Sequence, residues 1–570
     1  MINQNNKLEW TKRQETNSLA EIVMANTKMS QADLLNDTRT YYYPNLDKAE
    51  ELVRKHISLG NKITVYSDYD VDGVMSAKNL KNAFVLYQYK AVEFVSPRRF
   101  TDGYGVNVAR VKDFYDNGTK LIITIDNGIA ALDAIKLARG LGMDVIVLDH
   151  HQPVVVDGEV ILPEANVICD PHVTGGYEIG NPSHEFTDLC GAGIGYYFTV
   201  EVAKHVNVPE QYKTMLVEES LIGAAIATIA DVVSLVDDNR NIVKRGLALL
   251  NQNKGFAGVR ALLDVMNISK VRSEDIAFGV APCINASGRL YDSGAQTMFE
   301  LVTCLKNKEL ATVLAEKAKE ANDERKAETK DAVDRAIEYF EKNSVGNAIV
   351  YVDKIGSGIA GLVAAKLSEL FYKPTAVLTQ TARGDYKGSG RSIDEVDLKA
   401  MLDKCQSATD CFVGYGGHPG AAGLTVKADK LDDFVEALNK FVPLVEAPKT
   451  IYYDIELKPV AKDVLDNVAE SDLYEPYGAS NPAPLYCMKH VVLGDELGTT
   501  HKYMGSENQH VKFFVSGEKN LEIVWFNGAE EYKALGEPKC IDVLGTIGTN
   551  TFKGNTKAQV KVSNLRVCED

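Results

Sequence analysis

The sequence predicts an α/β protein with two domains of that class, joined by a long helix and followed by a small β-barrel. Three observations lead to this prediction. β-branched runs alternate with amphipathic stretches in two parts of the chain, a charged segment with few helix breakers lies between those parts, and the C-terminal part alternates apolar and polar residues. The 570 residues exceed what one ordinary core can hold. The predicted segments are an N-terminal extension (1–44), a first α/β domain (45–305), the connecting helix (306–345), a second α/β domain (346–445) and the barrel (450–570).

Four short runs define the predicted strands of the first α/β domain. Each is rich in β-branched residues, and amphipathic stretches such as 130–141 separate them. This alternation is the sequence form of a parallel sheet covered by helices. The runs are 62–66, 92–95, 121–125 and 144–148.

The same patterns predict the rest of the chain. Residues 306–342 contain many oppositely charged pairs four residues apart, which is typical of a solvated helix. The second domain opens with a strand candidate at 348–352 and contains two glycine-rich segments. From 450 on, short alternating runs separated by Gly and Asn suit an antiparallel barrel, of which the oligonucleotide-binding fold is one candidate.

The composition restricts the class of protein. It is 45% hydrophobic and 25% charged, as in globular proteins. No apolar run approaches the roughly 20 residues that cross a bilayer, and the chain starts without the apolar core of a signal peptide. We therefore expect a cytoplasmic protein with no membrane partner. The nine cysteines include no CxxC pair, which argues against a structural zinc site and a disulfide framework, so we expect buried free thiols.

The net charge bears on nucleic acids as partners. A formal charge of −17 disfavours a nucleic-acid binder, because phosphate contacts need local positive charge. However, carboxylates that bind cations contribute to this total, and a basic groove can lie on an acidic molecule. The charge alone therefore does not exclude a nucleic-acid substrate.

Four apolar runs end in acidic residues or histidines. The run 62–66 leads into Asp68, Asp70 and Asp72, 121–125 into Asp126, 144–148 into Asp149, His150 and His151, and 222–230 into Asp231. In an open parallel sheet the carboxyl ends of the strands lie along one edge, so residues distant in sequence meet there. The sequence therefore predicts that these strand ends bring six carboxylates and two imidazoles together.

Such a cluster repels itself unless it is protonated or neutralised by divalent cations. Its mixed oxygen and nitrogen ligands favour manganese or magnesium, and manganese is the better match to histidine. Two cations about 3.5 to 4 Å apart can activate a water and stabilise charge on a phosphoryl oxygen. An EF-hand calcium loop is the alternative for Asp68, Asp70 and Asp72, but its characteristic spacing is missing.

These residues resemble a known family. The segment 68–73 (DYDVDG), Asp126, the triplet 149–151 (DHH) and Asp231 look like the four motifs of the DHH phosphoesterase superfamily. Within it the chain is similar to the RecJ single-stranded-DNA exonucleases. Further matching segments are 99–105 (RFTDGYG), 189–193 (LCGAG), 284–290 (INASGRL), 388–392 (GSGRS), 416–423 (GGHPGAAG) and 475–484 (EPYGASNPAP). The likeness covers about residues 45–570 and implies a DHH domain, a DHHA1-type domain and an OB-like domain.

The resemblance implies an enzyme and a set of site residues. The implied reaction is metal-dependent, stepwise hydrolysis of single-stranded DNA from a 5′ end, which releases mononucleotides. The leading metal ligands are then Asp70, Asp72, Asp126, His150 and Asp231. Asp68 and Asp149 are further candidate ligands, and Asp149, His150, His151 and His418 are candidate catalytic residues. The chain departs from the family pattern at Cys283, where an arginine is usual, and at Gly356, where a histidine is usual.

Candidate phosphate ligands lie in the glycine-rich segments. Residues 387–392 place backbone amides, hydroxyls and a guanidinium within one predicted turn, which suits a phosphate. We assign Arg391, Ser389 and Ser392 to the substrate, with Arg391 and Ser389 at its 5′-phosphate, and Arg289 and Arg99 as further candidates. Gly417 allows the backbone to approach a nucleotide closely, and His418 is then placed to bond a phosphate near the metals. A plain glycine turn and a structural histidine are the alternatives.

The C-terminal region contains aromatic residues interleaved with lysines. Tyr477, Tyr486, Phe513, Phe514, Trp525 and Phe526 are candidate stacking platforms for bases. Because side chains alternate along a strand, about half of them must face the core.

The sequence is compatible with three functions. The main prediction is a 5′ to 3′ exonuclease that acts on single-stranded DNA. We expect it to be a monomer, with a single-strand-binding protein or a helicase as a further partner. One alternative is a DHH phosphodiesterase for short oligoribonucleotides or cyclic dinucleotides, but such enzymes usually lack a C-terminal region of this size. The other is a non-catalytic strand-binding replication scaffold, whose signature would be loss of the ligand carboxylates.

Overall fold

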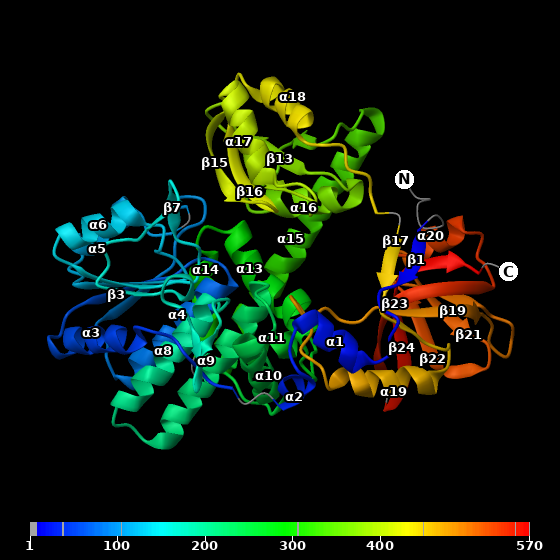
Figure 1. Ribbon diagram of the computed structural model, residues 1–570, viewed down its shortest axis with the longest axis horizontal. Helices are drawn as coiled ribbons and strands as arrows, with labels where there is room; N and C mark the ends of the chain where they lie inside the picture. The colour runs from blue at the N-terminus through cyan, green and yellow to red at the C-terminus, as the bar shows by residue number, and fades with distance from the viewer. Residues whose placement is uncertain are drawn as a thin grey trace. The chain divides into compact units, whose positions relative to one another are not determined.

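The computed structural model describes residues 8–36, 39–103, 105–304, 307–448, 450–552 and 554–568. Its contacts divide the chain into two compact units (Figure 1). The α/β unit comprises Tyr41–Val233 and Arg245–Ala447. The terminal unit comprises Met1–Thr40, Ser234–Lys244 and Pro448–Asp570. No helix in the described ranges combines the length and apolarity that crossing a membrane requires.

The first sheet of the α/β unit is parallel throughout, as predicted. Its strand order is β4-β3-β5-β6-β9, and all four pairings are parallel. The strands are β3 (Ile63–Tyr66), β4 (Val92–Val95), β5 (Leu121–Ile125), β6 (Asp144–Leu148) and β9 (Val167–Cys169). The four predicted runs are confirmed as strands. Strand β9 was not predicted, because three residues are too few to show a period.

Helices cover this sheet and extend it into a helical region. Those between the strands are α3 (Leu46–Ser58), α4 (Val71–Leu86), α5 (Val108–Asp116) and α6 (Leu132–Gly140). Those that follow are α7 (Pro171–Thr174), α8 (Gly191–His205), α9 (Glu210–Ala230), α10 (Asp237–Asn251), α11 (Ala257–Val265), α12 (Ser273–Asp275), the π-helical turn η2 (Ile276–Val280), α13 (Ala281–Leu290) and α14 (Gly294–Thr303). Short strand pairings join β2 (Tyr41–Tyr42), β10 (Tyr177–Glu178) and β11 (Asn181–Glu185), and β7 (Val154–Val156) with β8 (Glu159–Ile161).

One apolar run that we read as a strand end is a helix. Residues 222–230 form the C-terminal part of α9, which packs against α4 and α8 and is buried on all sides there. Periodicity fails to separate a helix segment buried all round from a buried strand, which explains the error. Asp231 is therefore the C-cap of a helix.

The connecting helix is confirmed as α15 (Lys308–Lys342), which leads to the second sheet. That sheet has the order β12-β13-β14-β16-β15. Its strands are β12 (Ile349–Val352), β13 (Thr375–Gln380), β14 (Tyr386–Arg391), β15 (Phe412–His418) and β16 (Ala421–Val426), and its helices are α16 (Ala360–Phe371), α17 (Leu398–Thr409) and α18 (Leu431–Phe441).

The prediction that residues 387–392 form a phosphate-binding turn is wrong about the backbone conformation. Residues up to Arg391 belong to β14, which pairs with β13 on one side and β16 on the other. Its backbone amides therefore serve the sheet, and only its side chains are available to a ligand. The glycines have a packing role, since a Cβ at Gly388 would lie 1.8 Å from the carbonyl oxygen of Val377.

The terminal unit is built around a seven-stranded sheet. Its strand order is β18-β19-β23-β24-β22-β21-β20. The strands are β18 (Ile455–Glu456), β19 (Tyr486–Val492), β20 (His501–Met504), β21 (His510–Val515), β22 (Glu518–Trp525), β23 (Cys540–Phe552) and β24 (Asn555–Val567). Four pairings are antiparallel and two parallel. Helices α19 (Ala461–Asp472) and α20 (Ala529–Ala534) complete this region.

The N-terminal extension belongs to the terminal unit. Strand β1 (Glu9–Lys12) pairs in parallel with β17 (Thr450–Tyr453). Helix α1 (Leu19–Thr27) contributes Leu19, Ile22 and Val23 to the apolar core of the unit, and α2 (Gln31–Asn36) follows it.

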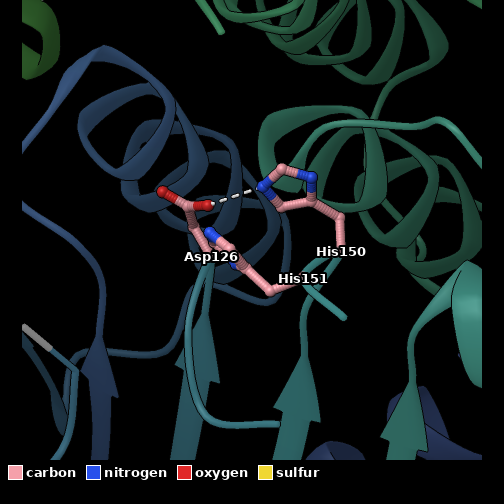
Figure 2. Close-up of side chains that lie close together, drawn as sticks. All are labelled: Asp126, His150 and His151. Atoms are coloured by element: carbon pink, nitrogen blue, oxygen red, sulfur yellow. Dashed lines mark hydrogen bonds and ion pairs between the residues drawn. The ribbon is translucent and has the colours of Figure 1, made fainter. Parts of the chain in front are cut away.

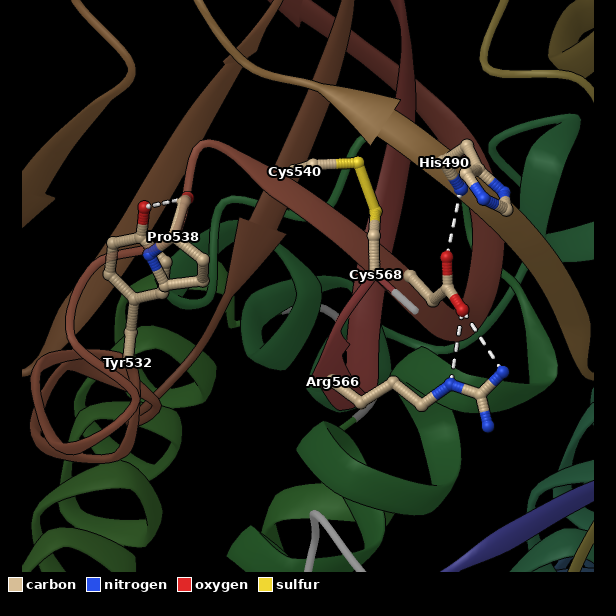
Figure 3. Close-up of a disulfide and its surroundings, with 7 residues drawn as sticks. His490, Tyr532, Pro538, Cys540, Arg566 and Cys568 are labelled. Carbon is tan, nitrogen blue, oxygen red and sulfur yellow. Dashed lines mark hydrogen bonds and ion pairs between the residues drawn. A yellow bond between two sulfur atoms is a disulfide. The ribbon is translucent and has the colours of Figure 1, made fainter. Parts of the chain in front are cut away.

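The expectation that all cysteines are free thiols is wrong. Cys540 and Cys568 form a disulfide with their Cα atoms 5.6 Å apart (Figure 3). The register of the β23–β24 pair sets Ile541 opposite Val567, so the two cysteines meet at the open end of this hairpin. Sequence spacing alone does not reveal that register. Among the described residues seven cysteines stay free, and six of them are buried.

Candidate metal centre

The acidic residues converge as predicted at one edge of the first sheet. Strands β3, β5 and β6 are neighbours and parallel, so the segments that follow them start side by side. Figure 2 shows Asp126 after β5 and His150 and His151 after β6, with Asp126 and His150 pointing toward each other. Helix α9 brings Asp231 to the same place from outside the sheet.

Three overlapping groups of side chains are placed to hold a cation. Within each group the ligand atoms lie within 4.8 Å of one another. The groups are Asp68, Asp70 and Asp126; Asp72, His150 and Asp231; and Asp126, His150 and His151. Asp126 and His150 each belong to two groups, which is the arrangement expected of ligands shared between neighbouring ions.

His150 lies at the centre of the carboxylates. Its Nε2 is 3.1 Å from Asp126 Oδ1, 3.5 Å from Asp72 Oδ2 and 3.8 Å from Asp231 Oδ2. Burial lowers the pKa of His150, so the neutral imidazole, which is the form that binds metals, is favoured.

Helix α8 supports Asp72 from behind. The backbone N–H groups of Gly191 and Ala192, at the start of that helix, donate to the two oxygens of Asp72, each at 2.7 Å. A Cβ at Gly191 would lie 2.8 Å from Cβ of Asp126. This explains why position 191 is a glycine, because a larger residue there would displace the candidate ligand Asp126.

Asp149 has a different environment from the other carboxylates. Its Oδ2 accepts from the backbone N–H of Ile129 at 2.9 Å, and its Oδ1 lies 2.7 Å from His151 Nδ1. Although burial alone would raise the pKa of Asp149, its hydrogen bond with His151 helps to hold it below the usual value. Burial alone would lower the pKa of His151. The hydrogen bond with Asp149 and the negative charge of that carboxylate outweigh this effect and raise the pKa of His151 to about 9. These contacts are those of an orienting group, and direct metal ligation by Asp149 stays a prediction.

The electrostatics of the cluster fit divalent cations. Burial and the charges of neighbouring carboxylates raise the pKa of Asp68, Asp70, Asp126 and Asp231, the last to about 8. In the described part of the chain, Oδ1 of Asp68 is buried without a hydrogen-bond partner. Carboxylates that repel one another and a buried acceptor that lacks a donor are both satisfied by a bound cation.

One carboxylate near the cluster escaped the sequence analysis. Asp170 follows the short strand β9, and its Oδ2 is buried with no hydrogen-bond partner among the described residues. Burial and the charge of Asp149 raise the pKa of Asp170 to about 8. The signal was an Asp-Pro pair after the apolar residues 167–169, which is weak because three residues show no period.

The predicted phosphate ligands meet at a second site, next to the start of α16. A Cβ at Gly361, in the first turn of that helix, would lie 2.9 Å from Nη2 of Arg391 and 3.3 Å from Oγ of Ser389. Nη1 of Arg289 donates to the carbonyl oxygen of Gly358 at 3.3 Å.

Like charges crowd this second site. Burial and the charges of Arg99 and Arg325 lower the pKa of Arg289 to about 10, against the opposing effect of Asp70. The guanidinium of Arg99 lies 4.6 Å above the ring of Tyr69. The structure therefore brings Arg99, Arg289 and Arg391 together beside the acidic cluster, whereas Tyr104 of the same predicted segment lies outside the described residues.

The surroundings of the remaining predicted residues, Ser392, Gly417 and His418, do not test their predicted roles. Ser392 donates its hydroxyl to the carbonyl oxygen of Val396 at 2.7 Å. Gly417 and His418 are exposed at the end of β15, and a Cβ at Gly417 would lie 2.2 Å from the carbonyl oxygen of Ala421. Roles for these residues in binding or catalysis stay predictions.

The aromatic residues of the terminal unit divide as alternation predicts. Tyr486, Phe513 and Trp525 are buried in the core. Tyr477 and Phe514 are half-buried, and Phe526 is 51% exposed.

Comparison with known proteins identifies the domains. The DHH family model for the N-terminal domain matches residues 62–229, the DHHA1 domain model matches 345–443 and the RecJ OB domain model matches 453–564. The single-stranded-DNA-specific exonuclease RecJ of Bacillus subtilis strain 168 is 31% identical over 533 residues, which are 92% of this chain and 64% of that protein. RecJ of Escherichia coli K12 is 27% identical over 547 residues, 91% of this chain and 90% of that protein.

A solved structure shares the fold. The crystal structure of RecJ from Thermus thermophilus in complex with Mn²⁺ has a TM-score of 0.78 at 22% identity, and the match covers 99% of this chain and 80% of that one. The present chain thus spans under two thirds of its Bacillus relative and most of the other two. The three domain models match in order along one chain and the RecJ relatives align with nine tenths of it, so the chain contains a DHH domain, a DHHA1 domain and a RecJ-type OB domain and is similar to the RecJ proteins along most of its length.

Proposed function

We propose that this protein is a metal-dependent exonuclease that hydrolyses single-stranded DNA from its 5′ end and releases mononucleotides. The observation that carries the proposal is the acidic and histidine cluster at the sheet edge, with a separate group of arginines beside it. The first suits divalent cations and the second suits a phosphate. A polynucleotide with a terminal phosphate offers both a phosphodiester and an anion to such a pair of sites.

The residues that would hold two cations, Mn²⁺ or Mg²⁺, are those of the three overlapping groups. When bound, such ions activate a water and stabilise the charge that develops on a phosphoryl oxygen. The chain itself keeps His150 neutral for ligation and holds Asp72 against the start of α8. Asp149, whose Oδ1 lies 2.7 Å from Nδ1 of His151, orients that imidazole within one of the three groups.

Arg99, Arg289 and Arg391 would select the 5′-phosphorylated end of the DNA strand. Arg391 and Ser389 lie together at the start of α16, and Arg289 is close enough for its pKa to respond to Asp70 of the metal centre. A terminal phosphate at these residues would place the first phosphodiester toward the cations. Three guanidiniums favour a dianionic phosphate monoester over a neutral 5′-hydroxyl.

The terminal unit favours a long strand as substrate. Its match to the RecJ OB domain and the exposed Phe526 suit binding of a polynucleotide strand. Enzymes for short oligoribonucleotides or cyclic dinucleotides usually lack such a unit, and a non-catalytic scaffold would not need every ligand carboxylate. A single-strand-binding protein or helicase as partner, a monomeric state and a cytoplasmic location stay predictions.

The test is release of mononucleotides from 5′-labelled single-stranded DNA with and without Mn²⁺, alongside RNA and duplex DNA of the same sequence. The expected result is Mn²⁺-dependent release from the single-stranded DNA and none by the D126A variant, which loses a shared ligand. Preferred cleavage of RNA dinucleotides would support the phosphodiesterase alternative. Strand binding without turnover in any metal would support the scaffold.

A further inference from the structure

Asn127 is a fully buried amide immediately after the candidate ligand Asp126. Its Nδ2 donates to the carbonyl oxygen of Ile125 at 2.9 Å and to that of Tyr66 at 3.2 Å. An asparagine that only formed a turn would bond within its own segment. This one also reaches the last residue of the neighbouring strand β3, so it joins two strands of the sheet.

The turn that follows β5 joins the ends of three neighbouring strands. Asn127 contributes the bond to β3, and the backbone N–H of Asp126 donates to the carbonyl oxygen of Leu148, the last residue of β6, at 2.9 Å. The candidate metal ligands follow these same strand ends, with Asp68 after β3 and His150 after β6. Any shift between β3 and β5 therefore moves Asp68 relative to Asp126 within one candidate ligand group.

Asp126 has a backbone conformation that needs support from its surroundings. Its φ is 61°, in the left-handed region, which a residue with a Cβ adopts at a cost in free energy. Its side chain points toward His150 in this conformation, as Figure 2 shows, with 3.1 Å between Oδ1 and Nε2. Because Asn127 anchors the next residue to β3, the backbone of Asp126 is held from two sides, by that anchor and by its own N–H bond to β6.

The amide of Asn127 carries a cost that packing alone does not explain. Its Oδ1 is buried and has no hydrogen-bond partner among the described residues. A buried acceptor without a donor is unfavourable, and leucine, which has the same branched shape, would fill this space without that cost. Leucine lacks only the two hydrogen bonds that Nδ2 donates. These two bonds therefore distinguish asparagine from an apolar residue at this position.

We propose that Asn127 is a positioning residue of the metal centre, which holds Asp126 in register with Asp68 by tying the end of β5 to the end of β3. It acts through Asp126, which two of the three candidate ligand groups share. Loss of the tie should therefore weaken the binding of both cations. The inference rests on the proposed function, which gives the cations their role, but cation binding is measured without DNA.

The test measures Mn²⁺ binding by the full-length protein in the absence of DNA, from the loss of the electron paramagnetic resonance signal of free Mn²⁺. The parent should bind two ions. N127L keeps the shape of the side chain without its donors. It should bind Mn²⁺ roughly 10- to 100-fold more weakly than the parent, as expected when a group that orients a metal ligand is lost.

Asn82, another buried amide of the α/β unit, offers a matched control. Its Nδ2 donates to the carbonyl oxygen of Leu216 at 3.1 Å and to Oγ of Ser220 at 2.9 Å, and both acceptors belong to helix α9. N82L therefore also loses two buried hydrogen bonds, but none that joins strand ends. It should melt at a lower temperature than the parent in EDTA and keep the parent's affinity for Mn²⁺.

The outcomes separate a positioning role from a structural one. Parent-like Mn²⁺ affinity in N127L would overturn the inference, and so would an equal loss of affinity in N82L, which would indicate a general loosening of the unit. If N127L does not fold, N127A decides the matter, and unchanged Mn²⁺ affinity in that variant rejects the inference. If N127L loses affinity as expected but the Mn²⁺-loaded parent releases no nucleotides from single-stranded DNA, the exonuclease function fails and the role of Asn127 stands.

Discussion

The backbone N–H of Gly191 lies 2.7 Å from Oδ2 of Asp72, so the start of helix α8 fixes a carboxylate that belongs to helix α4. Asp72 is the first-turn residue of α4 and is buried, and a second N–H, from Ala192, holds its other oxygen. The metal centre therefore depends on the contact between two helices as well as on the strand ends.

We predict that Gly191→Ala lowers the proposed nucleotide release by roughly 100-fold without unfolding the protein. The added Cβ would lie 2.8 Å from Cβ of Asp126, so either Asp126 or the start of α8 must move. A displacement of about 1 Å at a reacting centre can cost roughly 100-fold in rate. Gly140→Ala is the matched control, because a Cβ there meets nothing within 4 Å. Nucleotide release and circular dichroism of both variants check this, and normal release by the Gly191 variant would contradict it.

We predict opposite effects of Asp126→Asn on stability with and without metal. Without metal the variant should melt at a higher temperature than the parent, because one of several repelling buried carboxylates is gone. With Mn²⁺ the order should reverse, since a ligand present at 100 times its dissociation constant stabilises the parent by about 2.7 kcal/mol. Thermal melts in EDTA and in Mn²⁺ measure both effects. An equal Mn²⁺ shift in parent and variant would show that Asp126 is not a ligand.

The sequence predicted the strand-end part of this centre for a general reason. Parallel strands end at a common edge, so the order of apolar runs and acidic residues along the chain is enough to place Asp70, Asp126 and His150 together. Asp231 reaches the cluster as predicted, but it follows a helix and not a strand, because a helix that is buried on all sides shows no period in the sequence. Asp170 was missed because its strand has only three residues.

The rest depended on long-range packing that leaves no local pattern. The segment around Gly388 has the composition of a turn, yet it is a central strand because β13 passes close to it. The role of Gly191 follows from its distance to Asp126, and the pairing of Cys540 with Cys568 follows from a strand register. Such facts concern residues far apart in sequence, and a single sequence does not contain them.

A pH dependence is predicted for Asp144, at the start of β6 and so at the other end of that strand from the metal centre. Burial alone would raise the pKa of Asp144, but its hydrogen bonds with His56, Arg139 and Asn166 hold it below the usual value of about 3.9. Its ionised form therefore stabilises the fold above about pH 4, and this contribution is lost as the pH falls through the lowered pKa.

Asp144→Asn should accordingly lower the free energy of unfolding at pH 7, and the difference from the parent should shrink below about pH 4. Urea unfolding of both proteins across this range gives the difference directly. Asp133→Asn, on the neighbouring helix α6, serves as the control. A difference that stays constant from about pH 7 to about pH 3 would rule out the ionised carboxylate as its cause.

The disulfide should stabilise the terminal unit alone. Cys540 and Cys568 are 28 residues apart, and closing a loop of that length restricts the unfolded chain by about 3 to 4 kcal/mol in the loop-entropy estimate. A reducing agent should therefore lower the melting temperature of the terminal unit in the parent protein and leave the α/β unit unchanged. The double variant C540S/C568S should melt like the reduced parent and not respond to the reducing agent. Strands β23 and β24 are also joined by a long ladder of hydrogen bonds. The reduced parent and the double variant should therefore both still fold and bind single-stranded DNA. A terminal unit that melts at the same temperature in oxidised and reduced protein would show that this ladder alone sets its stability.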